Sequence, residues 1–212
     1  MDRRMPTQIE AVVLDFGGVM ARVYRPERFR DLEERLGLEP ESLPEILWRS
    51  PECRQAEVGK ISQEEYWQRI APRLGLQSSE AVRAFRHEVY GGISADAQMV
   101  GLVRRLRRRY RTGLLSNASA REPDRLVERY GLDGLFDVIV LSAAVGLAKP
   151  DPAVYELALE RLGTAAEATV FVDDYQPNVA VAMAMGFQGI HFSGYEELLP
   201  ALQNLGLILE PE

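Results

Sequence analysis

The sequence predicts an α/β fold, in which a Rossmann-like core with a parallel sheet carries an inserted block of helices. Three observations support this prediction. A short apolar, β-branched run at 9–16 ends at two glycines, which is typical of a buried strand followed by a tight turn. Up to about residue 91, only helical spacing of apolar residues follows. From Ala95 onward, helical and strand-like segments alternate, and such alternation implies a parallel sheet with helices on both faces.

The individual elements are expected in chain order as follows. The first, helical part predicts helices over 26–36, 41–48, 62–74 and 78–89. The alternating part predicts strands over 112–115, 138–141, 169–172 and 189–192, with helices ending near Tyr110, over 123–130, 152–162 and 178–185, and from Glu196. We therefore expect a core domain of residues 1–21 and 92–212 and a helical domain of residues 22–91.

The composition is that of an ordinary globular protein. The chain has 212 residues, of which 46% are hydrophobic and 27% charged, so it can bury a large core. Its formal net charge of -7 repels nucleic acid and acidic membrane surfaces, so neither is an expected partner. We accordingly interpret the arginine-rich run 104–111 as a solvated helix face. No apolar run approaches the ~20 residues that span a bilayer, and the start of the chain does not resemble a signal peptide, so we expect a cytoplasmic protein.

Lysine is unusually scarce in this chain. It occurs only at Lys60 and Lys149, which leaves 23 arginines among the 25 basic residues. Arginine presents a wide planar fork, whereas lysine is a compact point charge, so a tight site that needs one ammonium cannot accept arginine. The single cysteine, Cys53, excludes an intramolecular disulfide and is expected to be a small packing residue.

Polar residues follow four of the predicted strands. These residues are Asp15, the pairs 116–117 (Ser-Asn) and 173–174 (Asp-Asp), and Lys149. Each alone could shape a turn or cap a helix. The carboxyl ends of parallel strands meet at one edge of the sheet, where ligands bind in open α/β folds. Together they are the groups that phosphoryl transfer needs: a nucleophilic carboxylate, hydrogen-bond donors, an ammonium and acidic ligands for Mg²⁺.

At these positions the sequence resembles the haloacid dehalogenase (HAD) superfamily. The segments DFGGV at Asp15, LLSNAS at Ser116, LAKPDPAVYELAL at Lys149 and FVDDYQPNVAVAMAMG at Asp173 are similar to its four ordered motifs. The helical domain resembles a type 1 cap, and AEVGKISQEEYW from Ala56 is similar to a recurrent segment of such caps. A branch with DFGGV or DLGNV as its first motif includes phosphatases that act on sugar phosphates.

The resemblance implies a Mg²⁺-dependent phosphatase that hydrolyses a small phosphomonoester, such as a sugar phosphate, through an aspartyl-phosphate. The implied catalytic residues are Asp15 and Lys149, the phosphate ligands are Ser116, Asn117 and Lys149, and the metal ligands are Asp15, the carbonyl of Gly17 and Asp174. Asp173 is implied to contact the metal ligands without binding the metal itself, and Asn178 to reach the metal through water.

One position departs from the pattern of the family. Typical phosphatases of the superfamily have a second aspartate two residues after the nucleophile, which serves as general acid and base, and here that position is Gly17. Without this acid the rate should depend steeply on the pKa of the leaving group, unless water or a residue of the cap supplies the proton. Arg22 and Glu57 are candidate cap residues for contact with the substrate.

Two alternatives to the phosphatase are kept open. A metal-independent 2-haloacid dehalogenase shares the fold and the nucleophile, but Asp173 and Asp174 would repel a carboxylate substrate. A catalytically weak relative that binds a phosphorylated ligand or a protein is also compatible with the missing acid. Retention of Asp15, Lys149 and Asp174 together favours catalysis over this second alternative.

Overall fold

The centre of the molecule is a five-stranded parallel sheet with the strand order β3-β2-β1-β4-β5. The computed structural model describes residues 8–23, 25–119 and 122–209. The strands are β1 (Ala11–Leu14), β2 (Arg111–Ser116), β3 (Val138–Leu141), β4 (Thr169–Asp173) and β5 (Gln188–His191). The predicted α/β fold with a parallel sheet is confirmed. The chain leaves β1 on one side toward β2 and later returns on its other side with β4, so the order of the strands reverses beside β1.

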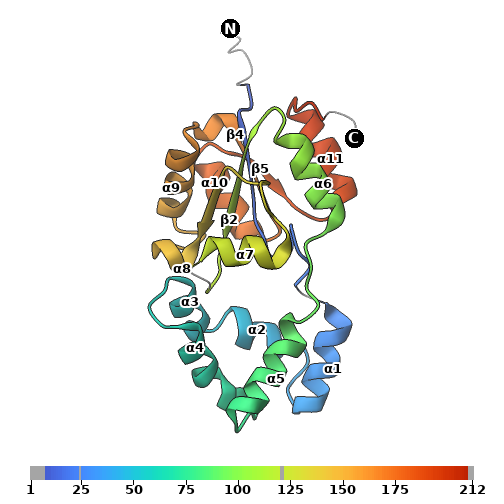
Figure 1. The fold of residues 1–212 in the computed structure, drawn as a ribbon, viewed down its shortest axis with the longest axis vertical. Helices are drawn as coiled ribbons and strands as arrows, with labels where there is room; N and C mark the ends of the chain where they lie inside the picture. The colour runs from blue at the N-terminus through green and yellow to red at the C-terminus, as the bar shows by residue number, and fades with distance from the viewer. Residues whose placement is uncertain (1–7, 24, 120–121, 210–212) are drawn as a thin grey trace.

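Helices cover both faces of this sheet (Figure 1). Alternate residues of β1 point to opposite faces, so Val12 and Leu14 join one buried cluster and Ala11 and Val13 another. The first cluster also contains residues of the helices α6 (Ala97–Leu106), α7 (Pro123–Tyr130) and α11 (Tyr195–Asn204). The second contains residues of α9 (Pro152–Leu162) and α10 (Gln176–Ala184). The core is therefore a three-layered sandwich with both faces of the sheet buried.

Between β1 and α6 the described residues form helices, apart from an isolated bridge between Gly17 and Ala21. These helices lie at the end of the sheet opposite the first and last described residues (Figure 1). They are α1 (Pro26–Leu36), α2 (Ser42–Trp48), α3 (Pro51–Glu57), α4 (Gln63–Ile70), a 3₁₀ turn (Ala71–Leu74) and α5 (Ser79–Tyr90). These helices pack around a hydrophobic cluster of their own, in which Trp67 makes edge-on contacts with Tyr66, Phe85 and Tyr90. Helix α3 touches the short helix α8 (Ser142–Val145) of the core, and Gln63 Nε2 donates to Ser119 Oγ at 3.1 Å.

Several segments differ from the sequence-based expectation, among them α8, which was not predicted. Helix α3 was not expected, although Ser50 caps it by accepting a hydrogen bond from the Cys53 N–H and Pro51 opens its first turn. Helix α6 ends at Leu106 instead of near Tyr110, because the following arginines form a turn that brings the chain into β2. The arginine run is therefore not one helix face.

Among residues 8–23, 25–119 and 122–209, no helix is long and apolar enough to cross a membrane.

A buried carboxylate fixes the start of α2. Glu33 of α1 is 4% exposed, and its two carboxylate oxygens accept the N–H groups of Glu41 at 2.9 Å and of Leu43 at 2.8 Å. These bonds satisfy donors at the N-terminal end of α2, which have no partner inside that helix.

We predict that Glu33→Ala destabilises the protein by roughly 1–3 kcal/mol, because it leaves the two N–H groups without their acceptor. A loss of that size lowers Tm by several degrees for a chain of this length. Thermal unfolding monitored by circular dichroism checks it, with Glu34→Ala, which removes an exposed neighbour, as the matched control. Equal Tm values for the two variants would contradict the proposed role of Glu33.

Candidate active site

The site lies at the carboxyl ends of β1 and β4, where the strand order reverses. Asp15 directly follows β1, and its N–H donates to the carbonyl of Val172 in β4 at 2.9 Å. Asp173 is the last residue of β4, and it pairs with His191 of β5. The parallel register thus places two acidic side chains from neighbouring strands beside each other, at the point where open α/β sheets bind their ligands.

A buried ammonium group joins these two carboxylates. Lys149 Nζ lies 2.7 Å from Asp15 Oδ1 and 2.6 Å from Asp173 Oδ2. The Lys149 side chain is 1% exposed, so both ion pairs are shielded from water. Lys60, the other lysine of the chain, is exposed.

The main chain of Lys149 is held by Asn117. The Asn117 side-chain amide donates to the Lys149 carbonyl at 2.9 Å, and its oxygen accepts the Lys149 N–H, also at 2.9 Å. These bonds join the end of β2 to the lysine loop, and the predicted contact of Asn117 with phosphate oxygens stays a prediction. Ser116, the last residue of β2, is buried at the same edge of the sheet.

Asp173 is held in place by further hydrogen bonds. Both of its carboxylate oxygens accept hydrogen bonds from the Asn178 side-chain amide, each at 3.1 Å, and Oδ1 also accepts the Tyr175 N–H at 2.8 Å. The predicted contact of Asn178 with a metal through water stays a prediction. Asp173 is 0% exposed, and its carboxylate, fixed by these bonds, holds the Lys149 ammonium in place.

Three carboxylates gather at this point. Asp15, Asp173 and Asp174 each place one ligand atom within 4.8 Å of the others, and Asp174 is the exposed member. When the three carboxylates are ionised, their negative charges outnumber the one positive charge of Lys149, so the net charge of the cluster is negative. Such a cluster would repel a phosphate dianion without a bound cation.

The loop after Asp15 brings its backbone close to Asp174. Gly18 has φ +85°, and a Cβ built on it would lie 2.0 to 2.7 Å from the atoms of the Asp174 carboxylate group. Gly17, in contrast, would accept a Cβ without a clash, since the nearest atom is Val23 Cγ2 at 3.8 Å, an ordinary van der Waals contact. No hydrogen bond among the described residues uses the Gly17 carbonyl as an acceptor. Gly18 was not singled out in the sequence, where the two adjacent glycines indicated only a tight turn.

Comparison with known proteins agrees with this arrangement. A family model described as haloacid dehalogenase-like hydrolase matches residues 9–186. The chain belongs to the haloacid dehalogenase-like hydrolases.

Two relatives of this HAD hydrolase match over most of their length. The chain is 32% identical to the sesquiterpene phosphatase astK of Aspergillus oryzae, over 89% of this chain and 92% of that protein. It is 25% identical to a D-ribitol-5-phosphate phosphatase of Bacteroides thetaiotaomicron, over 85% of this chain and 90% of that protein.

Solved structures share the fold. The HAD family enzyme bt-2542 of Bacteroides thetaiotaomicron, in complex with magnesium and inorganic phosphate, superposes with a TM-score of 0.70 at 21% identity, covering 90% of this chain and 98% of that one. An L-2-haloacid dehalogenase superposes with a TM-score of 0.64 at 28% identity, covering 86% of each chain. The fold is therefore common to both reaction classes.

The ionisation of the site reflects its burial. Burial raises the pKa of Asp15 to about 7, with further increases from the charges of Asp173 and Asp174, while Lys149 acts in the opposite direction. Burial favours the neutral form of Lys149, but Asp15 and Asp173 outweigh it and raise the pKa of its ammonium above the ordinary value. The lysine of this HAD hydrolase is therefore charged, and its positive charge favours the ionised form of Asp15.

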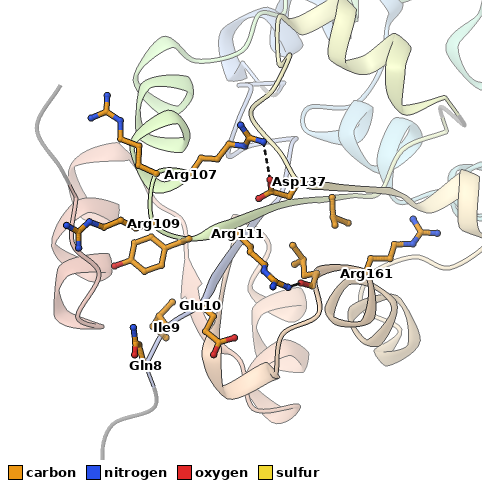
Figure 2. A pocket seen from close by; sticks show the side chains of 12 residues that line it. Gln8, Ile9, Glu10, Arg107, Arg109, Arg111, Asp137 and Arg161 are labelled. Atoms are coloured by element: carbon orange, nitrogen blue, oxygen red, sulfur yellow. Dashed lines mark hydrogen bonds and ion pairs between the residues drawn. The ribbon is translucent and has the colours of Figure 1, made fainter.

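A hollow lies around the start of β2, at the opposite end of the sheet from these carboxylates (Figure 2). Several arginines line it, but Arg107 pairs with Asp137 at 3.1 Å and Arg111 donates to the carbonyls of Leu162 and Gly163. Figure 2 shows Arg109 and Arg161 pointing away from each other at its two sides. Because these guanidinium groups diverge, we assign no anion site here.

We predict that Lys149→Arg is nearly as damaging to catalysis as Lys149→Ala. The ammonium sits between two carboxylates at 2.6 and 2.7 Å, a space too small for a guanidinium fork. Both variants should lower kcat/KM by at least ~10²-fold, the effect of removing one charge-stabilising group. The exposed lysine supplies the control, since Lys60→Arg should keep wild-type kcat/KM. An arginine variant at position 149 that keeps more than about half of wild-type kcat/KM would refute this role.

We also predict that Gly18→Ala disturbs Asp174. The added methyl group forces the Asp174 carboxylate to move, so the concentration of Mg²⁺ that gives half-maximal activity should rise by roughly 10- to 100-fold. Gly134→Ala is the matched control, because Gly134 has a similar positive φ of +65° but nothing within 4 Å of its built Cβ. If both variants need the same amount of Mg²⁺, the close approach has no role in metal binding.

Proposed function

We propose that this HAD hydrolase is a Mg²⁺-dependent phosphatase that hydrolyses a small phosphomonoester through an aspartyl-phosphate at Asp15. One observation carries the proposal: a buried ammonium, Lys149, holds Asp15 and Asp173 beside the more exposed Asp174. This arrangement combines a nucleophile, a fixed positive charge and an acidic ligand set at the edge of the sheet.

The donor set fits Mg²⁺. Hard divalent cations prefer carboxylate and carbonyl oxygens, and Asp15, Asp174 and the Gly17 carbonyl would supply them. When bound, Mg²⁺ would offset the excess negative charge of the site and polarise the phosphoryl oxygens. Asp173 is already bonded to Lys149, Asn178 and the Tyr175 N–H, so its part is to hold the lysine.

The side chains of this chain then have distinct tasks. Asp15 attacks phosphorus and carries the phosphoryl group until water attacks phosphorus and restores the carboxylate. The Lys149 ammonium stabilises negative charge on the transferring group. Ser116 would donate to the same oxygens, and Asn117 keeps the lysine loop in position and is a further candidate for phosphate contact.

The substrate is proposed to enter beneath the helical domain, residues 22–91, acting as a cap. The relatives named above act on phosphates of a sesquiterpene and of a polyol, which indicates a small phosphorylated metabolite as the substrate here. A sugar or polyol phosphate and an isoprenoid phosphate are the two classes to compare. In both classes the cap would contact the organic group, while the core would bind the phosphoryl group.

Charge argues against a dehalogenase. A 2-haloacid would have to place its own carboxylate beside Asp15, Asp173 and Asp174 with only Lys149 to compensate. Like charges at such distances disfavour binding. The weak-relative alternative leaves unexplained why a binding module would bury these charges, since isolated buried charges are costly.

We predict that a divalent cation is required for hydrolysis. A panel of aryl, sugar, polyol and isoprenoid phosphates is assayed with Mg²⁺ and with excess EDTA, together with 2-chloropropionate. Turnover of at least one phosphate ester should appear with Mg²⁺ and be lost with EDTA, and Asp15→Asn should be inactive in both conditions. Undiminished phosphatase activity in EDTA, or metal-free release of halide, would refute the proposed function.

A further inference from the structure

The site described so far lacks a proton donor for the leaving group. Position 17 is a glycine, and a Cβ built there would make only an ordinary van der Waals contact, with Val23 Cγ2 at 3.8 Å. Departure of an alkoxide from phosphorus is slow unless a proton reaches its oxygen. A carboxylic acid from another element would meet this need if it faced the same space.

Glu57, in the helical domain, is the candidate for such a group. It is the last residue of α3, and α3 touches α8, which lies at the carboxyl end of β3 and leads into the lysine loop (Figure 1). The Glu57 carboxyl interacts electrostatically with Lys149, the residue that bonds the nucleophile. Glu57 is half-buried, and among the described parts of the chain it forms no salt bridge.

The surroundings of Glu57 favour a carboxylic acid that can exchange its proton near neutral pH. Burial raises its pKa to about 7, while a hydrogen bond with the Cys53 thiol and the charges of Lys149 and Arg54 act against the rise. The thiol remains neutral, because burial raises the pKa of Cys53 above its ordinary range. Tyr66 of α4 also interacts with Glu57, and burial raises the pKa of its phenol as well.

We propose that Glu57 is the general acid and base of the reaction, in place of the side chain missing at position 17. This inference rests on the proposed phosphatase function. As Asp15 forms its bond to phosphorus and the bond to the leaving oxygen breaks, the Glu57 carboxyl gives its proton to that oxygen, and the alcohol departs. The resulting carboxylate then takes a proton from the water that attacks phosphorus, which releases phosphate and restores Asp15 and the protonated Glu57.

The test is Glu57→Gln, assayed with a series of phosphate esters that differ in leaving-group pKa. For alkyl esters such as glycerol phosphate, kcat/KM should fall by roughly 10²- to 10⁴-fold, because the leaving oxygen needs the proton. For 4-nitrophenyl phosphate, kcat/KM should stay near wild type while kcat falls and a burst appears, because breakdown of the aspartyl-phosphate lacks its base. A plot of log kcat/KM against leaving-group pKa should therefore be shallow for the wild type and steep for the variant.

Two further variants sharpen the test. Glu52→Gln removes another carboxylate from α3 and should leave the wild-type slope unchanged. Gly17→Asp in the Glu57→Gln background introduces a carboxylate at the position where the general acid is missing and should restore part of the activity on alkyl esters. If Glu57→Gln keeps the wild-type slope, the inference is wrong although the phosphatase function stands. If the wild type hydrolyses none of the esters, both fail.

A measurement on the wild type covers the case in which Glu57→Gln does not fold. The acid form of Glu57 is needed for alkyl esters, so their kcat/KM should fall as pH rises through about 7, relative to kcat/KM for 4-nitrophenyl phosphate. The ratio of the two values cancels titration of Asp15, and each kcat/KM is calculated for the phosphate dianion, because the phosphate groups of the two substrates differ in their second pKa. A ratio that stays constant through this range would overturn the inference.

Discussion

The site depends on one ammonium group buried between two carboxylates. Without Lys149, the carboxylates of Asp15 and Asp173 would lie close together, away from water, without a positive charge between them. The fold holds the lysine from two directions, since Asn117 bonds its main chain and Asp173 bonds its side chain. Loss of one member of such a buried set is costly, because the remaining charges stay buried without their partner. The position of Asp15, the proposed nucleophile, therefore depends on the lysine beside it.

The sheet topology explains why these groups meet. Asp15 follows β1 and Asp173 ends β4, and these strands are neighbours although more than half of the chain separates them. The loop after β1 contributes Gly18, whose missing side chain leaves room for Asp174. The helical domain enters the chain between β1 and α6, so it starts and ends next to this edge of the sheet. This placement is compatible with the proposed division of the chemistry, in which the core binds the phosphoryl group and the helical domain contacts the leaving group.

Much of this arrangement could be predicted from the sequence. The alternation of helical and strand-like segments predicted the parallel sheet, and the polar residues at the strand ends indicated a site at one edge of it. The scarcity of lysine singled out Lys149, because a chain rich in arginine retains lysine where only a compact charge fits. The structure places that residue where a compact charge is needed, in contact with two carboxylates.

Other features depend on packing that no local pattern encodes. The partners of Asn117 and Asn178 are determined by contacts across the sheet edge. The sequence did not indicate that Asn117 would bond the Lys149 main chain or that Asn178 would bond Asp173. Helix α3 has start signals at Ser50 and Pro51, but it is short, and its position against α8 follows only from the fold. The role proposed for Glu57 arises from that packing, since its distance along the sequence from Lys149 hides the interaction.

The central claim is that Asp15 carries the phosphoryl group, and trapping that intermediate tests it most directly. The protein is mixed with 4-nitrophenyl phosphate and Mg²⁺, quenched in acid within one turnover, digested and analysed by mass spectrometry. We predict one phosphoryl group on the peptide that contains Asp15, with none in EDTA and none in Asp15→Asn. Release of nitrophenol with no phosphorylated Asp15, or with the phosphoryl group on another residue, would contradict the account.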